Sequence, residues 1–392
     1  MSLLWSVVEG VAYSVVLLHF LYLSVYVLAA RLPMFKKKPF KSDVSISSDQ
    51  ALRFLIVIPA YKEDGVILQT VRNALNQSYP TAQFHVAVIS DSMQDSTNAA
   101  LAALPITLLP VSFEVSSKAL ALRALMTQIN DSYDFVVVLD SDNIVAPSFL
   151  TQVAEYGQQG LRFMQARRVA KRLESDMAIF DAITEAFNNT VFRKGHNCLG
   201  LPSALIGSGM VLDFNWFKAN VHELKTFGED KELEWLLLLQ NKYVAYLEDV
   251  EVKDEKIETN RVYYNQRKRW ISVQYEQFVG NYKKIPQLIK NRQWALLDKV
   301  TQWIMLPRVV LFGITVLILI LNLIFTFSID LKWFYLLLFE VATFFLGIPK
   351  RLLGKFLRVS WKVVPMAFVL MLLNLLLRGR VKTFQATPHQ DS

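Results

Sequence analysis

Residues 3–30 form an apolar stretch. About 20 such residues are enough for a helix to cross the hydrocarbon core of a bilayer. Five Lys or Arg residues follow between Arg31 and Lys41. The alternative, a cleaved signal peptide, would carry its basic residues before a shorter apolar run. The flanks therefore predict an uncleaved transmembrane anchor over 1–33, with its N-terminus outside, followed by a basic linker over 34–50 on the cytosolic side.

A second group of apolar runs lies near the other end of the chain. Residues 303–327 predict a crossing, and Pro307 and Arg308 mark its cytosolic end. After a short turn, residues 333–348 predict a return to the cytosolic side. The two runs together predict a helical hairpin in the membrane.

The last hundred or so residues also carry a basic segment. Residues 349–362 contain five Lys or Arg at amphipathic spacing, which is typical of a helix that lies on anionic headgroups. Residues 363–377 form a short apolar run before further basic residues, and re-entrant, interfacial and paired-crossing arrangements stay open for it. We expect transmembrane and interfacial helices over 301–378 and a cytosolic tail over 379–392.

Between these ends the chain is rich in charged residues. Overall, 53% of the residues are hydrophobic and 19% are charged, which is too apolar for a purely soluble domain and too charged for a purely membrane-embedded one. The composition excludes a disordered chain, a fibrous rod and a disulfide-stapled mini-protein. The net charge of +8 is largely juxtamembrane, which favours anionic lipid over nucleic acid as its partner. Cys198 is the only cysteine, so no intramolecular disulfide forms, and a reducing compartment is the natural interpretation.

The middle of the chain, residues 51–260, alternates between two patterns. Apolar runs suited to buried strands alternate with segments whose apolar residues recur at helical spacing. The strands are expected at 53–61, 84–91, 106–112 and 134–142, and the helices at 64–77, 95–104 and 118–129. This alternation predicts an α/β domain with a doubly wound parallel sheet. Ligands of such sheets bind beyond the carboxyl ends of the strands.

Polar residues follow three of the expected strands. They are residues 60–64, Ser90 with Asp91, and residues 140–143. Because the carboxyl ends of parallel strands meet at one edge, we expect these clusters to converge. No glycine pattern of a dinucleotide-binding or P-loop site is present, so a nucleotide would be held by other means.

Asp140 and Asp142 are two residues apart directly after a buried strand. Carboxylate oxygens suit Mg²⁺ or Mn²⁺, which take one or two protein carboxylates together with substrate phosphates. Two solvated aspartates in a turn are the alternative, because a D-x-D pattern alone is weak. Its place after the strand favours the metal site.

Glu229 and Asp230 open an apolar helix. A carboxylate at this position is stabilised by the helix dipole, so Asp230 as a helix cap is one interpretation. The other is a general base that deprotonates an acceptor hydroxyl. Residues 207–209 (Gly-Ser-Gly) are either a loop that lines an acceptor site or a simple turn.

Residues 266–270 read QRKRW, within amphipathic helices expected at the membrane interface over 261–300. A fixed guanidinium such as that of Arg269 binds diphosphate oxygens, and Trp270 offers a flat face for a sugar ring. A basic amphipathic helix on the membrane surface would have the same composition.

Taken in order, these segments resemble the family-two glycosyltransferases with a GT-A fold, and among them the membrane-integrated cellulose, hyaluronan and poly-N-acetylglucosamine synthases. The resemblance rests on VIPAYKED, SDSMQDST, SSKALALRAL, DSDN, GSG, GED and QRKRW. It implies a doubly wound mixed sheet of the GT-A type between an N-terminal anchor and C-terminal membrane helices. Ser117 stands where a glycine is common in the family, and Gly228 replaces a common threonine.

The resemblance also implies roles for individual residues. The catalytic residues would be Glu229, Asp230, Arg269 and Trp270, and the metal ligands Asp140 and Asp142. Asp91 would contact the uracil or ribose. The substrate-binding residues would be Pro59, Ala60, Tyr61, Glu63, Asp91, Lys118, Asp140, Ser141, Gly207, Ser208, Gly209, Gln266 and Arg267.

The expected activity is a metal-dependent, inverting transfer of GlcNAc or glucose from a UDP-sugar to a growing β-linked polysaccharide. Transfer of a single sugar to a lipid acceptor, as in ceramide glucosyltransferases, is the rival interpretation. A non-catalytic channel or scaffold subunit is the third. The expected partners are a UDP-sugar, a polysaccharide or lipid acceptor and membrane lipids, with no nucleic acid. A homo-oligomer or accessory export subunits stay open. The expected location is a bacterial inner membrane with the catalytic domain in the cytosol.

Overall fold

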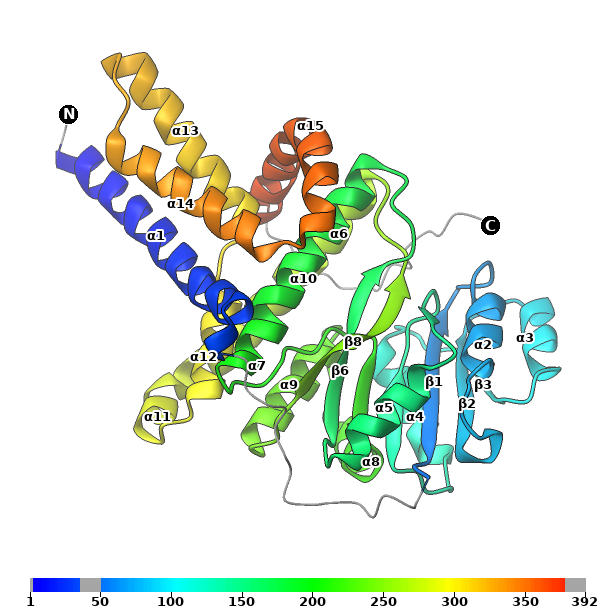
Figure 1. Ribbon diagram of the computed structural model, residues 1–392. Coiled ribbons are helices and arrows are strands. Elements are labelled where there is room, and N and C mark those ends of the chain that lie inside the picture. Colours follow the sequence, from blue (N-terminus) through cyan, green and yellow to red (C-terminus); the bar gives the residue numbers. More distant parts are fainter. Residues whose placement is uncertain (1–2, 36–50, 378–392) are drawn as a thin grey trace. The chain divides into compact units, whose positions relative to one another are not determined.

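The computed structural model describes residues 3–35 and 51–377, which divide into two compact units (Figure 1). The sheet unit comprises residues 51–172 and 201–256. The helical unit comprises residues 3–35, 173–200 and 257–377. Most of the predicted basic linker and all of the predicted tail lie outside the described residues.

The sheet unit is built on one eight-stranded sheet with the order β3-β2-β1-β4-β7-β6-β8-β5 among the described residues. Its strands are β1 (Phe54–Tyr61), β2 (Phe84–Asp91), β3 (Thr107–Val111), β4 (Phe135–Val138), β5 (Ile144–Val145), β6 (Phe163–Ala170), β7 (Met210–Asp213) and β8 (Ala245–Asp254). The first four are parallel neighbours, whereas β7 is antiparallel to both β4 and β6. The predicted mixed sheet of the GT-A type is confirmed.

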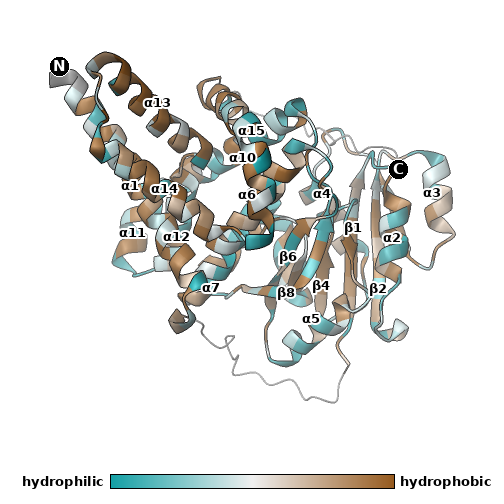
Figure 2. Cartoon of the chain, turned by 45° about the horizontal axis from the view of Figure 1, so that its top comes forward, coloured by the Kyte–Doolittle hydropathy of each residue, from teal (hydrophilic) through white to brown (hydrophobic). Residues whose placement is uncertain are grey.

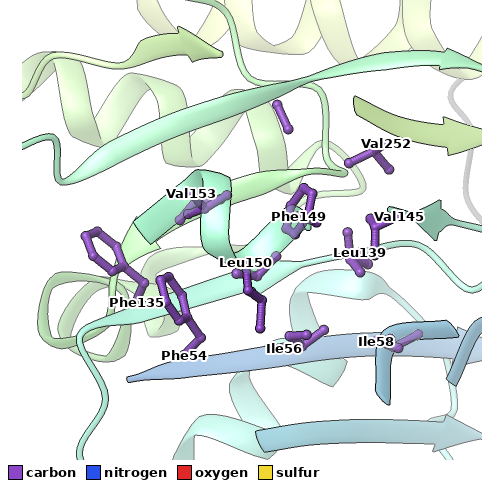
Figure 3. Close-up of a cluster of buried hydrophobic side chains, with 14 of the residues drawn as sticks. Phe54, Ile56, Ile58, Phe135, Leu139, Val145, Phe149, Leu150, Val153 and Val252 are labelled. Atoms are coloured by element: carbon purple, nitrogen blue, oxygen red, sulfur yellow. The ribbon is translucent and has the colours of Figure 1, made fainter. Parts of the chain in front are cut away.

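The centre of the sheet is buried on both faces, which explains its continuous apolar runs. Along β1, Phe54, Ile56 and Ile58 point into one core and Leu55 and Val57 into the other, and all five are fully buried. Figure 3 shows the first core, where Phe54, Ile56 and Ile58 of β1 pack with other buried side chains, among them Phe135, Phe149 and Leu150. The two cores lie between the sheet and the helices on its two faces.

The helices of the sheet unit are α2 (Ile67–Leu75), α3 (Asp95–Ala102), α4 (Lys118–Gln128), α5 (Phe149–Gln158), α8 (Phe214–Asn220) and α9 (Glu229–Leu239), with short 3-10 turns η2 (Thr81–Gln83) and η4 (Val221–Glu223). Among these helices, α2, α3, α4 and α9 begin close to the positions that the sequence predicts, whereas α5 and α8 were not predicted. Ser117 caps α4, because its hydroxyl oxygen accepts a hydrogen bond from the Leu120 N–H (3.2 Å). This residue, which replaces a common glycine, therefore fixes the start of the helix.

The helical unit contains the remaining elements. These are α1 (Leu3–Arg31), η1 (Pro33–Phe35), α6 (Asp176–Asn188), the π-helical η3 (Asn189–Gly195), α7 (His196–Cys198), α10 (Asn260–Asn281), η5 (Tyr282–Lys284), α11 (Ile285–Lys290), α12 (Trp294–Ile304), α13 (Arg308–Thr326), α14 (Leu331–Gly347) and α15 (Lys350–Leu376). Its helices pack mainly on one another: α1 on α14 and η3, α6 on α15, and α13 on both α14 and α15.

Three helices among the described residues are long and apolar enough to cross a membrane, by length and composition. They span Ser6–Arg31, Arg308–Thr326 and Lys350–Leu376. Figure 2 shows the apolar character of α13 along its length. Large apolar side chains of these helices are exposed, such as Leu18 and Ile320, as expected of surfaces that contact lipid. The first two helices correspond to the predicted crossings over 3–30 and 303–327.

Two segments differ from the sequence prediction. Residues 173–200 pack in the helical unit, so the domain predicted over 51–260 is interrupted. The reason is that α6 is buried on nearly all sides and packs against α15. Residues 350–376 form one helix instead of an interfacial helix and a separate short run, because the helix continues through Pro365. Membrane helices accept proline where neighbouring groups compensate for its missing N–H.

Candidate active site

The strands β1 and β2 end at the same level of the sheet. Tyr61, the last residue of β1, lies opposite Asp91, the last residue of β2. The next residues, Lys62 and Ser92, both have a φ of 55° and turn the chain away from the sheet. The Lys62 N–H donates to the Asp91 carbonyl oxygen (3.2 Å), and the Ser92 hydroxyl donates to the Asp91 carboxylate (2.9 Å). The buried Asp91 side chain is thereby held at this edge.

The loops after these strands are joined by further contacts. The Glu63 N–H contacts the Met93 sulfur (3.1 Å), and the Asp64 carboxylate accepts a hydrogen bond from the Gln94 N–H (2.9 Å). The predicted residues Pro59 and Ala60 lie within β1 itself, opposite Ile89 and Ser90 of β2. The first two predicted polar clusters, residues 60–64 and Ser90 with Asp91, therefore lie side by side at the carboxyl ends of β1 and β2.

The third cluster, residues 140–143, is a turn directly after β4, the other neighbour of β1. The Asn143 N–H donates to the Asp140 carbonyl oxygen (3.1 Å), and the Asn143 side chain accepts from the Asp140 N–H (2.9 Å). One Asp142 carboxylate oxygen accepts from the Asn143 side-chain amide (2.9 Å), and the other accepts from the Glu255 N–H (3.0 Å). Ser141 is anchored by the Thr70 hydroxyl, which donates to its carbonyl oxygen (2.7 Å). Both aspartates are thus fixed beside the ends of β1 and β2.

Lys118 connects this turn with the rest of the site. It is the first residue of α4, and its ammonium group lies 2.5 Å from Asp140 Oδ1 and 3.7 Å from Glu229 Oε1. The ammonium also donates to the Gly207 carbonyl oxygen (2.6 Å). One cation therefore joins three predicted site segments: the turn after β4, the Gly-Ser-Gly loop and the start of α9.

The Gly-Ser-Gly loop lies against the same turn. Gly207 and Gly209 have φ values of +77° and +65°, a conformation that favours glycine. The Ser208 hydroxyl donates to the Asn143 side-chain oxygen, and the Gly209 N–H donates to the Val138 carbonyl oxygen of β4 (2.8 Å). A Cβ atom on Gly207 would lie 3.3 Å from Glu229 Oε1, so the backbone approaches the carboxylate closely.

Glu229 and Asp230 occupy the first turn of α9, whose N-cap residue is Gly228. Asp230 is thus the second residue of the helix. The alternative interpretation of Asp230 as the helix cap is wrong, because Gly228 occupies the cap position. Asp230 Oδ1 accepts a hydrogen bond from the Lys231 N–H (2.9 Å), and the Asp230 side chain is 20% exposed. The N-terminal end of a helix stabilises such carboxylates in their charged form.

Burial and neighbouring charges shift the pKa values of this cluster in opposite directions. Burial raises the pKa of Glu229 to about 7, although the Lys118 ammonium lowers it. Burial alone would lower the pKa of Lys118, but the charges of Asp140 and Glu229 raise it overall. Lys118 is therefore charged at neutral pH. The perturbed pKa values of neighbouring groups in this position are typical of functional sites.

The carboxylates of this cluster suit a divalent cation that arrives with a phosphate ligand. Among residues 3–35 and 51–377, no group of three or more His, Cys, Asp or Glu side chains could hold a metal ion. Asp140 and Asp142 supply oxygen ligands of the type that Mg²⁺ and Mn²⁺ prefer, and the Asp140 side chain is 37% exposed. Two carboxylates fit an ion whose other ligands are substrate phosphates and water.

The QRKRW residues lie on α10 of the helical unit. The Arg267 guanidinium pairs with Asp181 and lies 4.1 Å from the centre of the Trp270 ring. Gln266 and Arg269 lie on the same helix and are partly exposed. Since they belong to the other unit, the roles predicted for these four residues stay predictions.

Sequence reasoning missed one residue that supports the site. Gln165 of β6 is fully buried, accepts from the Ile206 N–H (3.1 Å) and donates to the Ser208 carbonyl oxygen (2.8 Å), so it holds the Gly-Ser-Gly loop. Its signal in the sequence is a lone amide in the buried first half of this strand. Asn143, a member of the predicted polar cluster 140–143, supports the turn after β4.

The sheet and this cluster define a class of protein: the chain belongs to the glycosyltransferase-like family 2, whose family model matches residues 52–272. That match covers more than half of the chain. The family predicted from the motifs is confirmed.

Among curated proteins, the chain is similar to the β-monoglucosyldiacylglycerol synthases of Trichormus variabilis and of a Nostoc species. They are 24% and 23% identical to it over 245 residues, which cover 60% of this chain and 51% of each relative. The chain thus spans about half the length of the curated relatives it matches.

Among solved structures, the chain resembles the mannosyltransferase PcManGT from Pyrobaculum calidifontis, which was solved with GDP-Man and Mn²⁺. The TM-score is 0.55 at 16% sequence identity, and the match covers 94% of this chain and 98% of that chain. A likeness at this identity establishes the common fold.

Proposed function

We propose that this protein transfers a hexose from a UDP-sugar to a hydroxyl group of a membrane lipid, with inversion at the anomeric carbon. The observation that carries the proposal is the Lys118 ammonium, which joins Asp140, Gly207 and Glu229 in one cluster at the carboxyl edge of the sheet. Ligands of doubly wound sheets bind at this edge. The family membership supports the reaction class.

Asp140 and Asp142 would hold a Mg²⁺ or Mn²⁺ ion, which, when bound, neutralises the charge that builds on the departing diphosphate. Lys118 keeps the Asp140 carboxylate in place. Asp91, held at the end of β2, would contact the uracil or ribose. The Gly-Ser-Gly loop, whose backbone comes close to Glu229, would line the acceptor side.

Asp230 would take the proton of the acceptor hydroxyl while that oxygen attacks the anomeric carbon from the face opposite the diphosphate. Its place in the first turn of α9, with the side chain 20% exposed, leaves the carboxylate open to an acceptor hydroxyl. Arg269 and Trp270 would contact the diphosphate and the sugar ring, as the resemblance implies.

A lipid acceptor is favoured for two reasons. The curated relatives carry the name of diacylglycerol glucosyltransferring enzymes, and helices suited to cross a membrane flank the sheet unit in the sequence. Transfer to a growing β-linked polysaccharide is the second candidate, and the QRKRW signature of polymerising family members favours it. Either acceptor fits a catalytic unit on the cytosolic side of a bacterial inner membrane.

Purified protein in lipid-containing detergent would be incubated with radiolabelled UDP-glucose or UDP-GlcNAc and Mg²⁺ or Mn²⁺. One added sugar on an extractable lipid is the expected product by mass spectrometry. A ladder of sugars would select the polysaccharide instead. Undiminished transfer after removal of metal with EDTA would contradict the role of Asp140 and Asp142, and the absence of transfer from every UDP-sugar would overturn the donor class.

A further inference from the structure

The helical unit encloses a cavity of about 560 Å³, a size typical of small-molecule sites. Side chains from α1, α6, η3, α10, α12, α13, α14 and α15 line it, and most of them are apolar. Its wall is rich in phenylalanine: Phe180, Phe312, Phe344, Phe345 and Phe356. We call this space the helical cavity. An apolar lining of this kind suits a hydrocarbon chain better than a sugar chain.

One side of the helical cavity opens along α15. Leu357 and Trp361 line the cavity, yet they are 59% and 70% exposed. Both belong to α15, one of the helices with the length and composition of a membrane span. In a bilayer this opening would face lipid, so a lipid chain could enter from the side.

The cavity also has a polar end at the start of α13. Arg308, the first residue of α13, lines it together with Arg267 and Gln302. The Arg308 guanidinium donates to the Asn188 side chain (2.9 Å) and lies 4.3 Å from the centre of the Phe187 ring. Among the described residues, no carboxylate lies within ion-pair distance of it.

The acidic residues on this side already have arginine partners. Asp181 pairs with Arg267, and Glu185 pairs with Arg193 at 3.0 Å. Arg308 is thus a third guanidinium beside these two ion pairs. The Asp298 carboxylate near this end accepts a hydrogen bond from Gln302 (2.8 Å). A buried cation in such a setting is costly unless an anion accompanies it.

The helix itself adds to this positive end. The first turn of α13 contains no acidic residue, and no side chain caps it. The N-terminus of a 19-residue helix carries a partial positive charge and free N–H groups, which favour an anion. Arg308 and the helix terminus therefore act in the same direction.

The far part of the cavity is built differently. Glu340 also lines it, but its carboxyl accepts a hydrogen bond from the Thr315 hydroxyl (2.6 Å), two turns of α13 beyond Arg308. At a rise of about 1.5 Å per residue, seven residues of α13 separate these positions by roughly 10 Å. The cavity thus has a cationic end and an apolar body.

We propose that the helical cavity binds one anionic membrane lipid, with its phosphate at Arg308 and an acyl chain in the apolar body. Two lining residues, Arg267 and Trp270, belong to the QRKRW segment, whose role in sugar transfer is a separate proposal. Lipid binding is measured without sugar transfer, so the two proposals can fail independently. The helical cavity would select phospholipids with a net negative headgroup over zwitterionic or neutral lipids.

The test is native mass spectrometry of the full-length protein in detergent, titrated with dioleoyl phosphatidylglycerol, dioleoyl phosphatidylcholine or diolein. One phosphatidylglycerol per chain is expected, with about tenfold preference over the other two, because charge-assisted hydrogen bonds stabilise it. Arg308→Met should remove this preference and Arg308→Lys should keep most of it. Arg351→Met, a matched change at an exposed arginine of α15, should leave it unchanged.

A second variant addresses the apolar body. Val364→Phe adds bulk to the cavity wall and should weaken the binding of all three lipids to the same extent. Circular dichroism and gel filtration would check that the variants fold. Equal binding of the three lipids by the wild-type protein would overturn the proposal. So would unchanged phosphatidylglycerol binding by Arg308→Met, or full displacement by inorganic phosphate, which would indicate a free-anion site.

Discussion

The carboxylates of the sheet unit and of the helical unit differ in their hydrogen-bond and ion-pair partners. At the sheet edge, the carboxylates of Asp140 and Glu229 share the Lys118 ammonium, and the Asp140 side chain is 37% exposed. In the helical unit, the Asp298 side chain is 12% exposed, and its Oδ1 accepts hydrogen bonds from the hydroxyls of both Tyr22 and Tyr26 (2.8 Å each).

Asp298 receives further partners from His196 (3.1 Å) and Gln302 (2.8 Å). Burial alone would raise the pKa of Asp298, but the hydrogen bond and charge of His196 lower it to about 2. This cluster connects α1, α7 and α12, and both carboxylate oxygens of Asp298 accept hydrogen bonds within it. The comparison teaches that the sheet edge retains one carboxylate, Asp140, that is accessible to a ligand, whereas the helical cluster serves packing.

The largest effect is expected from Asp142→Asn. Loss of one carboxylate ligand would remove metal-assisted stabilisation of the departing diphosphate, which contributes several kcal/mol, so sugar transfer should fall about 10³-fold. Transfer rates and Mn²⁺-dependent UDP binding check this. A variant with wild-type transfer would place the metal, if any, elsewhere.

Lys118→Met should reduce stability as well as transfer. Removing the ammonium leaves the buried Glu229 carboxylate without its cation, which costs about 2–3 kcal/mol after allowance for the exposure of Asp140. The melting temperature of the purified protein measures this loss. The double variant with Glu229→Gln should regain stability but not transfer, and a double variant as unstable as the single one would contradict this account of the cluster.

The pH dependence of stability should change in Glu229→Gln. In the unfolded chain the Glu229 carboxyl releases its proton near its usual pKa of 4.5, whereas the folded protein holds it to about 7. The folded state thus binds more protons between these values, and raising the pH through this window destabilises the wild-type protein. Between pH 5 and pH 8, the melting temperature of the wild type should therefore fall relative to that of the variant. Parallel curves of melting temperature against pH for the two proteins would argue against the raised pKa.

The smallest effects are expected from two glycine substitutions, one in each unit. Gly207→Ala should cost about 1–2 kcal/mol, because its φ of +77° is strained for alanine. Gly280→Ala on α10 meets no atom within 4 Å and should stabilise the protein by up to about 1 kcal/mol. Melting temperatures that shift in the same direction for both would contradict the local geometry.

Local patterns were enough to predict β1 to β4, the turn after β4 and the family, but not β5 to β8. Buried apolar runs bounded by polar residues have few other solutions, and Asp140 and Asp142 lie where the end of β4 puts them. The Lys118 contacts could not be predicted from spacing, because Glu229 and Gly207 reach the ammonium only through the tertiary fold.

The helical unit was harder to predict for a related reason. The apolar pattern of residues 176–188 indicates a buried helix but not its partner, and the pairing of Asp181 with Arg267 becomes visible only in three dimensions. The helical cavity, formed by helices from three separate segments of the chain, leaves no local signal at all.

The carboxylate cluster at the sheet edge is tested most directly by the rate of sugar transfer from a saturating UDP-sugar in Asp230→Asn. The matched control is Asp131→Asn, the same change at an exposed aspartate of the loop that precedes β4, at the opposite end of the strand. Loss of a general base should lower the Asp230→Asn rate about 10²- to 10⁴-fold, while UDP binding and the control stay at wild-type levels. A wild-type rate in Asp230→Asn would show that another group accepts the proton.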